Sequence, residues 1–249
     1  MKNYNRRKFI KTTAFSAAAF TAATTLSNCE NENLNPDSKG KYMGGFSAPK
    51  MESVRVAFIG LGARGSGHLK SIAKLEGVEV VAISDLFEDN VIRSLKVANE
   101  IGKGERHNKI AQYWGEDNKW KLMLKEIKPD AVFISTNWNN HAPMAIHSME
   151  NGAHAFVEVP IAVTIEDMWK IVNTSEETQK HCMMMENVNY GRDELMYLNM
   201  CRKGVIGELL HAEAAYIHEL RFQMSQEERG TGSWRTHHYA NGKGNLYPT

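Results

Sequence analysis

The stretch "VRVAFIGLGARG", from Val54 to Gly65, decides the fold of this chain. Its first part is a short apolar run rich in β-branched residues, and it ends on Gly60. Helical spacing of apolar residues follows through Leu69 and Leu75, and a second apolar run covers residues 78–84. Strand, glycine turn, helix and strand form the βαβ unit of a parallel sheet. The sequence therefore predicts an α/β fold built on a doubly wound parallel sheet.

The turn after the first strand matches the pattern GxGxxG through Gly60, Gly62 and Gly65, and Asp85 stands at the end of the second strand. The pattern is weak alone, but a strand before it, a helix after it and an acidic residue about 20 positions further on are the context of a dinucleotide site. Gly60 allows the tight turn, Gly62 lets the backbone approach a pyrophosphate, and Gly65 lets the helix pack on the strand.

Asp85 indicates which dinucleotide this turn would bind. Its carboxylate could accept hydrogen bonds from both ribose hydroxyls and would repel a 2′-phosphate. The sequence therefore predicts NAD as the cofactor, in preference to NADP. An α/β turn with incidental glycines is the alternative interpretation.

Three further apolar runs, at residues 130–135, 153–159 and 181–188, continue the predicted sheet. We expect a helix between the first two, with Pro143 in its first turn and Asn151-Gly152 at its end. A capping box at residues 164–167 predicts the next helix. Cys182 and the three methionines that follow it are predicted to be core residues.

Glu158 is the one carboxylate in the run "HAFVEVPIAV", directly before Val159-Pro160. Burying an unpaired charge is costly, and proline ends a central strand. In parallel sheets ligands meet the carboxyl ends of the strands. We therefore expect Glu158 at the cofactor-facing rim, on the same edge as the Gly60 turn and the loops that begin at Thr136 and Asn187.

Composition fits an ordinary soluble protein with one or two domains. The chain has 249 residues, a net charge of +1 and 42% hydrophobic residues, so charge gives no case for nucleic acid or an anionic membrane surface as a partner. Cys29, Cys182 and Cys201 show no CxxC spacing, and His237-His238 have no metal-ligand partners at useful spacing. We predict no metal site and no disulfide framework.

The first 29 residues read as a targeting segment rather than as part of the fold. Arg6 and Arg7 precede an apolar stretch, Thr12–Leu26, that is too short to span a bilayer permanently. This resembles a twin-arginine export signal, and "LSNC" resembles a lipoprotein cleavage box with Cys29 as the lipidated residue. A disordered basic leader is the alternative. Residues 30–52 are expected to form a flexible linker, and the protein is expected in the periplasm or anchored to a membrane.

Several separated motifs resemble the Gfo/Idh/MocA family of NAD(P)-dependent oxidoreductases. They are the glycine turn, Asp85, the Asn-His-Ala-Pro helix start at residues 140–143 and the Glu-X-Pro strand end at Glu158–Pro160. In the dehydrogenases of that family the last motif is usually Glu-Lys-Pro, and its lysine takes part in proton transfer. Val159 stands at that position here and cannot carry a proton, which argues against an ordinary dehydrogenase.

A narrower resemblance, to glycoside hydrolase family 109, accounts for the valine. It rests on Gly62–Gly65, Trp138–His141, Glu158–Pro160, the motif at residues 186–190 and the terminal "GNLYPT". The characterised activity of that family is an NAD-dependent α-N-acetylgalactosaminidase. The resemblance implies a Rossmann-type NAD-binding domain over residues 53–188 and an incomplete α+β substrate domain over residues 189–249.

The resemblance also implies individual roles. Cofactor contacts are implied for Arg64, Gly65, Asp85, Trp138, Asn139, Asn140, His141, Glu158, Val159 and Asn187. Sugar contacts are implied for Tyr216, Arg235, Tyr247, Pro248 and Thr249. Tyr247 is the implied acid/base residue, with a histidine that in the family follows directly after the position of Thr249.

Tyr190 is a second catalytic candidate, because its phenol could hydrogen-bond the C3 oxygen of the sugar. Other interpretations stay open for three of these residues. Tyr190 could be a rim aromatic between domains, Tyr216 a sheet-face aromatic, and Arg235 the partner of a nearby carboxylate.

Most glycosidases use two carboxylates, and NAD-dependent families are exceptions. In the NAD route, oxidation at C3 of the sugar acidifies the hydrogen at C2, the C1 aglycone leaves by elimination, water adds, and the hydride returns to C3. A periplasmic sugar dehydrogenase with net release of NADH and a glycan-binding lipoprotein without catalysis are the alternatives.

Residues beyond Gly191 predict few elements. They are a helix at residues 193–202, one strand around residues 209–220 and a loop from Arg229. So few elements cannot enclose a sugar site. We therefore expect a truncated chain that binds NAD weakly or not at all without its missing half and does not cleave substrate by itself.

Overall fold

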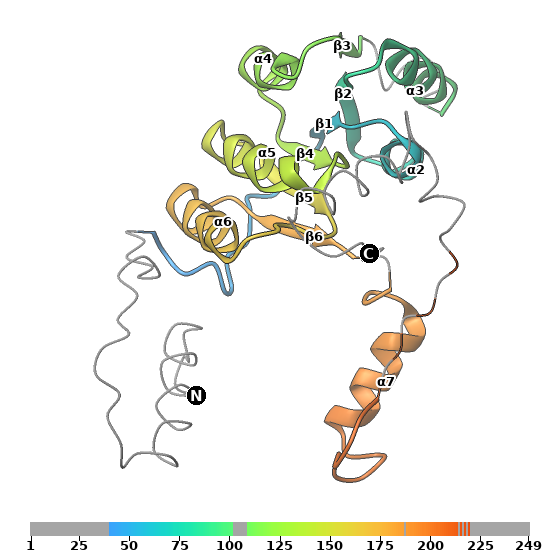
Figure 1. The fold of residues 1–249 in the computed structure, drawn as a ribbon, viewed down its shortest axis with the longest axis vertical. Coiled ribbons are helices and arrows are strands. Elements are labelled where there is room, and N and C mark those ends of the chain that lie inside the picture. Colours follow the sequence, from blue (N-terminus) through green and yellow to red (C-terminus); the bar gives the residue numbers. More distant parts are fainter. Residues whose placement is uncertain are drawn as a thin grey trace.

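The computed structural model describes residues 40–101, 109–186, 188–213, 215, 217 and 219. The predicted targeting segment, residues 1–29, and the first part of the predicted linker lie outside the described residues. Strands and helices alternate along the described chain (Figure 1). The elements are β1 (Val54–Ile59), α2 (Ala63–Ile72), β2 (Val78–Ser84), α3 (Glu88–Ile101), β3 (Ala111–Tyr113), α4 (Lys119–Ile127), β4 (Ala131–Ile134), α5 (Trp138–Glu150), β5 (His154–Glu158), α6 (Ile165–Thr178), β6 (Cys182–Met185) and α7 (Arg192–Arg202).

The six strands form one parallel sheet in the order β3-β2-β1-β4-β5-β6. Strand order therefore reverses beside β1: the chain moves outward through β2 and β3, then returns to place β4 on the other side. This is the doubly wound topology of the dinucleotide-binding folds, so the predicted fold class is confirmed. In such folds the ligand crevice lies at this reversal, outside the loops that follow the two central strands, here β1 and β4.

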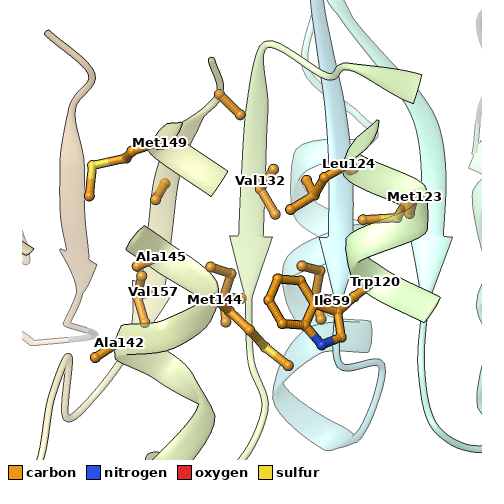
Figure 2. Close-up of a cluster of buried hydrophobic side chains, with 14 of the residues drawn as sticks. Ile59, Trp120, Met123, Leu124, Val132, Ala142, Met144, Ala145, Met149 and Val157 are labelled. Carbon is orange, nitrogen blue, oxygen red and sulfur yellow. The ribbon is translucent and has the colours of Figure 1, made fainter. Parts of the chain in front are cut away.

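Helices cover both faces of the sheet, and each face has its own apolar core. Helices α4, α5 and α6 pack on one face, where Trp120, Leu124, Ala145 and Val157 belong to one buried cluster (Figure 2). Helices α2 and α3 pack on the other face, where Leu69 joins a second cluster. Because parallel strands are buried on both faces, they read as continuous apolar runs, which is why the pattern of residues 54–59 and 78–84 identified them.

An aromatic stack joins the three central strands on the face that carries α2. Register places Phe58, Phe133 and Phe156 side by side on β1, β4 and β5. Ring centroids are 5.1 Å apart for the first pair and 4.8 Å for the second, and both pairs are stacked. This stack packs the side chains of β1, β4 and β5 against one another on that face, two residues before Glu158.

Helix α5 begins earlier than the sequence predicted. Asn137 caps it by accepting a hydrogen bond from the Asn140 backbone N–H at 3.2 Å, and Trp138 is its first residue. Pro143 therefore lies inside the helix, in its second turn, and the prediction of a first-turn proline was wrong. A strong asparagine cap six residues before Pro143 outweighs the preference of proline for the first turn.

Strand β6 is an edge strand, and its methionines are not all core residues. Met183 and Met184 are 38% and 37% exposed, while Cys182 and Met185 are half-buried. The prediction of core residues was wrong for the first two, because β6 pairs only with β5 among the described strands. An apolar run looks alike in sequence at the centre and at the edge of a sheet.

Residues after β6 leave the sheet, and Figure 1 shows α7 extending away from it. Helix α7 confirms the predicted helix, but none of its residues is buried. The described residues between Leu209 and Glu219 belong to no strand, so the predicted strand there is not seen. Among the described residues, no helix has the length and apolar character needed to cross a membrane.

The described end of the predicted linker contacts the sheet domain. Lys41 donates its backbone N–H to the Glu176 carbonyl at 3.2 Å, and Gln179 returns a side-chain hydrogen bond to the Lys41 carbonyl at 3.0 Å. Phe46 lies with its ring centroid 5.0 Å from that of His181. These contacts place residues 41–46 beside the end of α6 and the start of β6.

Candidate functional site

Two of the three glycines in the turn after β1 are required by backbone packing. Gly60 has φ +85°, a region that favours glycine, and a Cβ there would meet the Ser135 carbonyl oxygen at 2.5 Å. A Cβ on Gly65 would collide with the carbonyl oxygen of Gly60. These glycines bring β1, the start of α2 and the end of β4 into close contact at the carboxyl edge of the sheet.

Gly62 differs from both, because a Cβ there would meet nothing within 4 Å. It is the N-cap of α2, and no side chain caps that helix. The helix start therefore presents backbone N–H groups and a positive dipole end to open space. Together with the bare Gly62 backbone, this suits a dinucleotide pyrophosphate.

Asp85 follows β2 at the same edge and organises the glycine turn. One carboxylate oxygen accepts the Leu61 backbone N–H at 2.6 Å, and the other accepts Phe87 N–H at 2.8 Å and the Asn90 side chain at 3.1 Å. Arg93 donates to the Asn90 side-chain oxygen at 2.7 Å and to the Leu61 carbonyl at 3.2 Å. Sequence reasoning missed Asn90 and Arg93, although their spacing of one helical turn on α3, just after Asp85, was a signal.

Residues of the Trp138–His141 motif divide between the surface and the interior. Asn139 and Asn140 are exposed at the start of α5, whereas Trp138 is buried. His141 is 1% exposed, and its ring nitrogens face two carbonyls, with Nδ1 2.7 Å from Pro160 O and Nε2 3.1 Å from Thr136 O.

The position of His141 ties together the loops that follow β4 and β5. Burial lowers the pKa of His141, and the two carbonyls and the Glu158 charge raise it by less. The ring is therefore neutral in the folded protein near neutral pH.

Glu158 is the last residue of β5, at the carboxyl edge where it was expected. Oε1 lies 2.5 Å from Nε2 of His68 on α2, and Oε2 accepts the Val159 N–H at 3.3 Å. Burial raises the pKa of Glu158, but the hydrogen bond and charge of His68, the Arg64 charge and the Val159 N–H together hold it below its ordinary value. The carboxylate is therefore ionised and paired. Sequence reasoning missed His68.

The remaining predicted site residues do not join this group in the described chain. Tyr190 is 58% exposed in the turn before α7. Val159 is half-buried next to Glu158, and its peptide bond to Pro160 is cis. Asn187, Tyr216, Arg235, Tyr247, Pro248 and Thr249 lie outside the described residues.

Comparison with known families agrees with this geometry. The model of an oxidoreductase family with an NAD-binding Rossmann fold, Gfo/Idh/MocA, matches residues 54–186. The model of the glycosyl hydrolase 109 C-terminal domain matches residues 190–249. The chain belongs to glycosyl hydrolase family 109, within the Gfo/Idh/MocA oxidoreductases. The fold of residues 54–186 is accordingly the NAD-binding Rossmann fold of that family.

Individual members of glycosyl hydrolase family 109 align with most of the chain. Glycosyl hydrolase family 109 protein 1 of Akkermansia muciniphila is 60% identical over 208 residues, which are 84% of this chain and 42% of that protein. The alpha-N-acetylgalactosaminidase of Shewanella oneidensis is 51% identical over 250 residues, covering 100% of this chain and 54% of that protein. The chain thus spans about half the length of the curated relatives it matches.

Among solved structures, an NAD-binding protein from Listeria innocua is similar at 25% identity with a TM-score of 0.51, covering 64% of this chain and 42% of that one. The overlap agrees with the Gfo/Idh/MocA fold of the described sheet. The candidate dinucleotide site of this chain is therefore the carboxyl edge of the sheet, which holds Asp85, Gly62 and Glu158.

Proposed function

We propose that this protein is an NAD-dependent glycosidase that removes terminal α-linked N-acetylgalactosamine without net oxidation. The observation that carries the proposal is the order of its two parts. A dinucleotide fold with its crevice at the carboxyl edge is followed at once by a segment that matches the glycosyl hydrolase 109 C-terminal domain. The name of the Shewanella relative supports the choice of sugar.

Residues of the described edge fit the two ends of a dinucleotide. The open N-terminus of α2 and the bare backbone of Gly62 would hold the pyrophosphate, and Asp85 would hold the adenosine ribose. NAD, when bound, would supply the reversible removal of a hydride from C3 of the sugar, which permits elimination at C1 without net redox change. The protein's own work is then to orient the sugar, exclude water and handle protons.

Val159 leaves the proton of the sugar alcohol, which is released in either reaction when C3 is oxidised, without an acceptor at this position. It follows Glu158 directly at the carboxyl edge, and its aliphatic side chain cannot take the alcohol proton that a lysine there would carry. Proton transfer must come from other residues. We propose Tyr247 for this role, Tyr190 as a hydrogen-bond donor to the C3 oxygen, and Tyr216, Arg235, Pro248 and Thr249 as sugar contacts.

The direct test uses the natural full-length gene product with p-nitrophenyl α-N-acetylgalactosaminide, following nitrophenol release together with absorbance at 340 nm. Nitrophenol release without accumulation of NADH is the expected result, and the β-anomer serves as the control substrate. Accumulation of NADH in proportion to the sugar consumed would identify a dehydrogenase instead. Sugar binding with neither signal would identify a glycan-binding protein.

We also propose that the protein is exported by the twin-arginine route and anchored through Cys29. The paired Arg6-Arg7, the short apolar stretch after them and the Cys29 box support this. Fractionation of the producing bacterium tests it: replacing both arginines by lysine should retain the protein in the cytoplasm, and Cys29→Ser should release it from the membrane. Unchanged fractionation of both variants would refute the proposal.

A further inference from the structure

His68 and Glu158 join two elements on opposite sides of the crevice. His68 lies on α2, which follows β1, and Glu158 ends β5, beyond β4. Nε2 and Oε1 are 2.5 Å apart, and the side chains are 29% and 13% exposed. The pair thus links α2 to the end of β5, and none of the sequence motifs included His68.

Few charged groups lie near the Glu158 carboxylate among the described residues. Arg64 on α2 and His141 on α5 are the other titratable groups that interact with Glu158, and the Val159 N–H binds its second oxygen. Arg64 is exposed and therefore screened by solvent, while His141 is buried and neutral. His68 is therefore the basic side chain in direct contact with the Glu158 carboxylate.

Topology indicates which end of a dinucleotide would face this pair. Asp85 lies after β2, on one side of the α2 N-terminus, and would mark the adenosine end. A dinucleotide laid across the crevice places its pyrophosphate at the helix start and its other half over β4 and β5. Glu158 ends β5, so the pair lies on the nicotinamide side.

We propose that His68 is a positioning residue that holds the Glu158 carboxylate and offsets its charge beside the nicotinamide, so that the oxidised and reduced cofactors are bound with comparable affinity. This inference rests on the proposed NAD dependence. The oxidised nicotinamide ring is cationic and the reduced ring is neutral, so an unbalanced carboxylate nearby favours the oxidised form. A catalyst that removes a hydride and returns it in each turnover works best when neither form is strongly favoured.

The test measures the dissociation constants of NAD⁺ and NADH by calorimetry on the full-length gene product at about neutral pH. Glutamine can still donate a hydrogen bond to Glu158 but carries no charge. In His68→Gln, the preference for NAD⁺ over NADH should therefore rise on the order of tenfold. The double variant His68→Gln/Glu158→Gln also lacks the carboxylate, and its preference should return to within about twofold of the wild type.

His147→Gln is the matched control, because His147 also pairs with a glutamate (Nδ1 to Glu150 Oε2, 3.7 Å) but lies at the far end of α5. It should leave both dissociation constants unchanged. A purely structural role for His68 predicts that His68→Gln weakens both cofactors equally and that the double variant rescues nothing, and this result would overturn the inference. Failure of the wild type to bind either cofactor would overturn the proposed function first, and the inference with it.

Discussion

Three glycines at the start of α2 differ in what surrounds them, and two of them are required for different reasons. A Cβ on Gly65 would collide with the carbonyl oxygen of Gly60, whereas Gly62 and Gly67 both face open space. Gly62 lies at the helix start, where a pyrophosphate would lie, and Gly67 lies inside the helix. Packing therefore requires Gly65, and the approach of a ligand requires Gly62. Neither requires Gly67.

Alanine at each of these positions separates the two requirements. Gly65→Ala should lower the free energy of unfolding by about 3 kcal/mol through overpacking. Gly62→Ala should change it by less than about 1 kcal/mol but weaken NAD binding about tenfold or more. Gly67→Ala, the control, should stabilise by about 0.5–1 kcal/mol and bind NAD normally. Urea unfolding and calorimetry measure both quantities, and normal NAD affinity in Gly62→Ala would contradict the assignment.

Asp130, at the opposite edge of the sheet, accepts a backbone N–H as Asp85 does. Comparing variants of the two residues therefore separates cofactor binding from fold stability. Asp130 accepts the Arg55 backbone N–H at 2.8 Å, much as Asp85 accepts that of Leu61 at 2.6 Å. Both oxygens of Asp85 accept N–H groups, so an asparagine there places an amide donor against one of them, whereas an asparagine at Asp130 can still accept the Arg55 N–H with its amide oxygen. Asp85→Asn should therefore lose about 1–3 kcal/mol of stability, and Asp130→Asn should lose less.

Only Asp85→Asn should also weaken NAD binding, by about tenfold or more, because only Asp85 lies at the carboxyl edge. Its discrimination against NADP should fall at the same time, since the carboxylate no longer repels a 2′-phosphate. Calorimetric titration of both variants with NAD and NADP measures this. Equal NAD affinity in the two variants would show that Asp85 acts only on the fold.

At the scale of elements, α5 joins two loops of the site through one buried ring. The ring nitrogens of His141 face the carbonyls of Thr136 and Pro160, one in each of the loops that follow β4 and β5, and the neutral ring can donate its one N–H to either of them. Because burial lowers the pKa of His141 below its ordinary value, the unfolded chain takes up a proton at a pH where the folded ring stays neutral. Stability from this source is present above about pH 6.5 and is lost as pH falls below it.

We therefore expect His141→Gln to be less stable than the wild type at neutral pH, by about 1–3 kcal/mol for the lost contacts. The difference in the free energy of unfolding between wild type and variant should be smaller at about pH 5. The reason is that the variant has lost one group that binds a proton on unfolding. His154, whose pKa is also lowered by burial, keeps its own contribution in both proteins. Urea unfolding at the two pH values is the measurement. A difference that does not become smaller would mean that the His141 ring is charged in the folded state.

Sequence patterns identified the elements that are marked locally, by a continuous apolar run or by a helix-capping residue. The bounds of β2 agree with the apolar run at residues 78–84, and Thr164 caps α6 as predicted, accepting the Asp167 N–H at 3.1 Å. Helices α3 and α4 and the three-residue β3 were not identified, since a strand as short as β3 depends on its partner rather than on its own pattern.

The candidate site was predictable only where a strand end marked it. Asp85 and Glu158 were expected at the carboxyl edge from their place in the pattern, and both lie there. His68 was not expected, because its partner is 90 positions away in sequence and contacts of that range depend on how the elements pack. The interior positions of His141 and Trp138 are likewise products of packing, since their motif reads as a polar helix start.

At the scale of the whole molecule, the reversal of strand order organises the site. Helix α2 begins at the crevice, Asp85 lies on its β2 side and Glu158 on its β5 side, and both carboxylates are held by groups of α2 or of the turn before it. One helix start thus connects the two ends of the proposed cofactor site. The glycosyl hydrolase 109 C-terminal segment follows directly, where it could supply the sugar contacts.

The most direct test of the proposed redox-neutral glycosidase follows the hydrogens of the sugar. The full-length gene product would cleave an α-N-acetylgalactosaminide in D₂O, and proton NMR would examine the released N-acetylgalactosamine. We predict deuterium at C2, because elimination removes that hydrogen and solvent replaces it, while C3 keeps its original hydrogen because the hydride returns. Release of a sugar that keeps its original hydrogen at C2 would contradict the proposed chemistry and indicate direct hydrolysis.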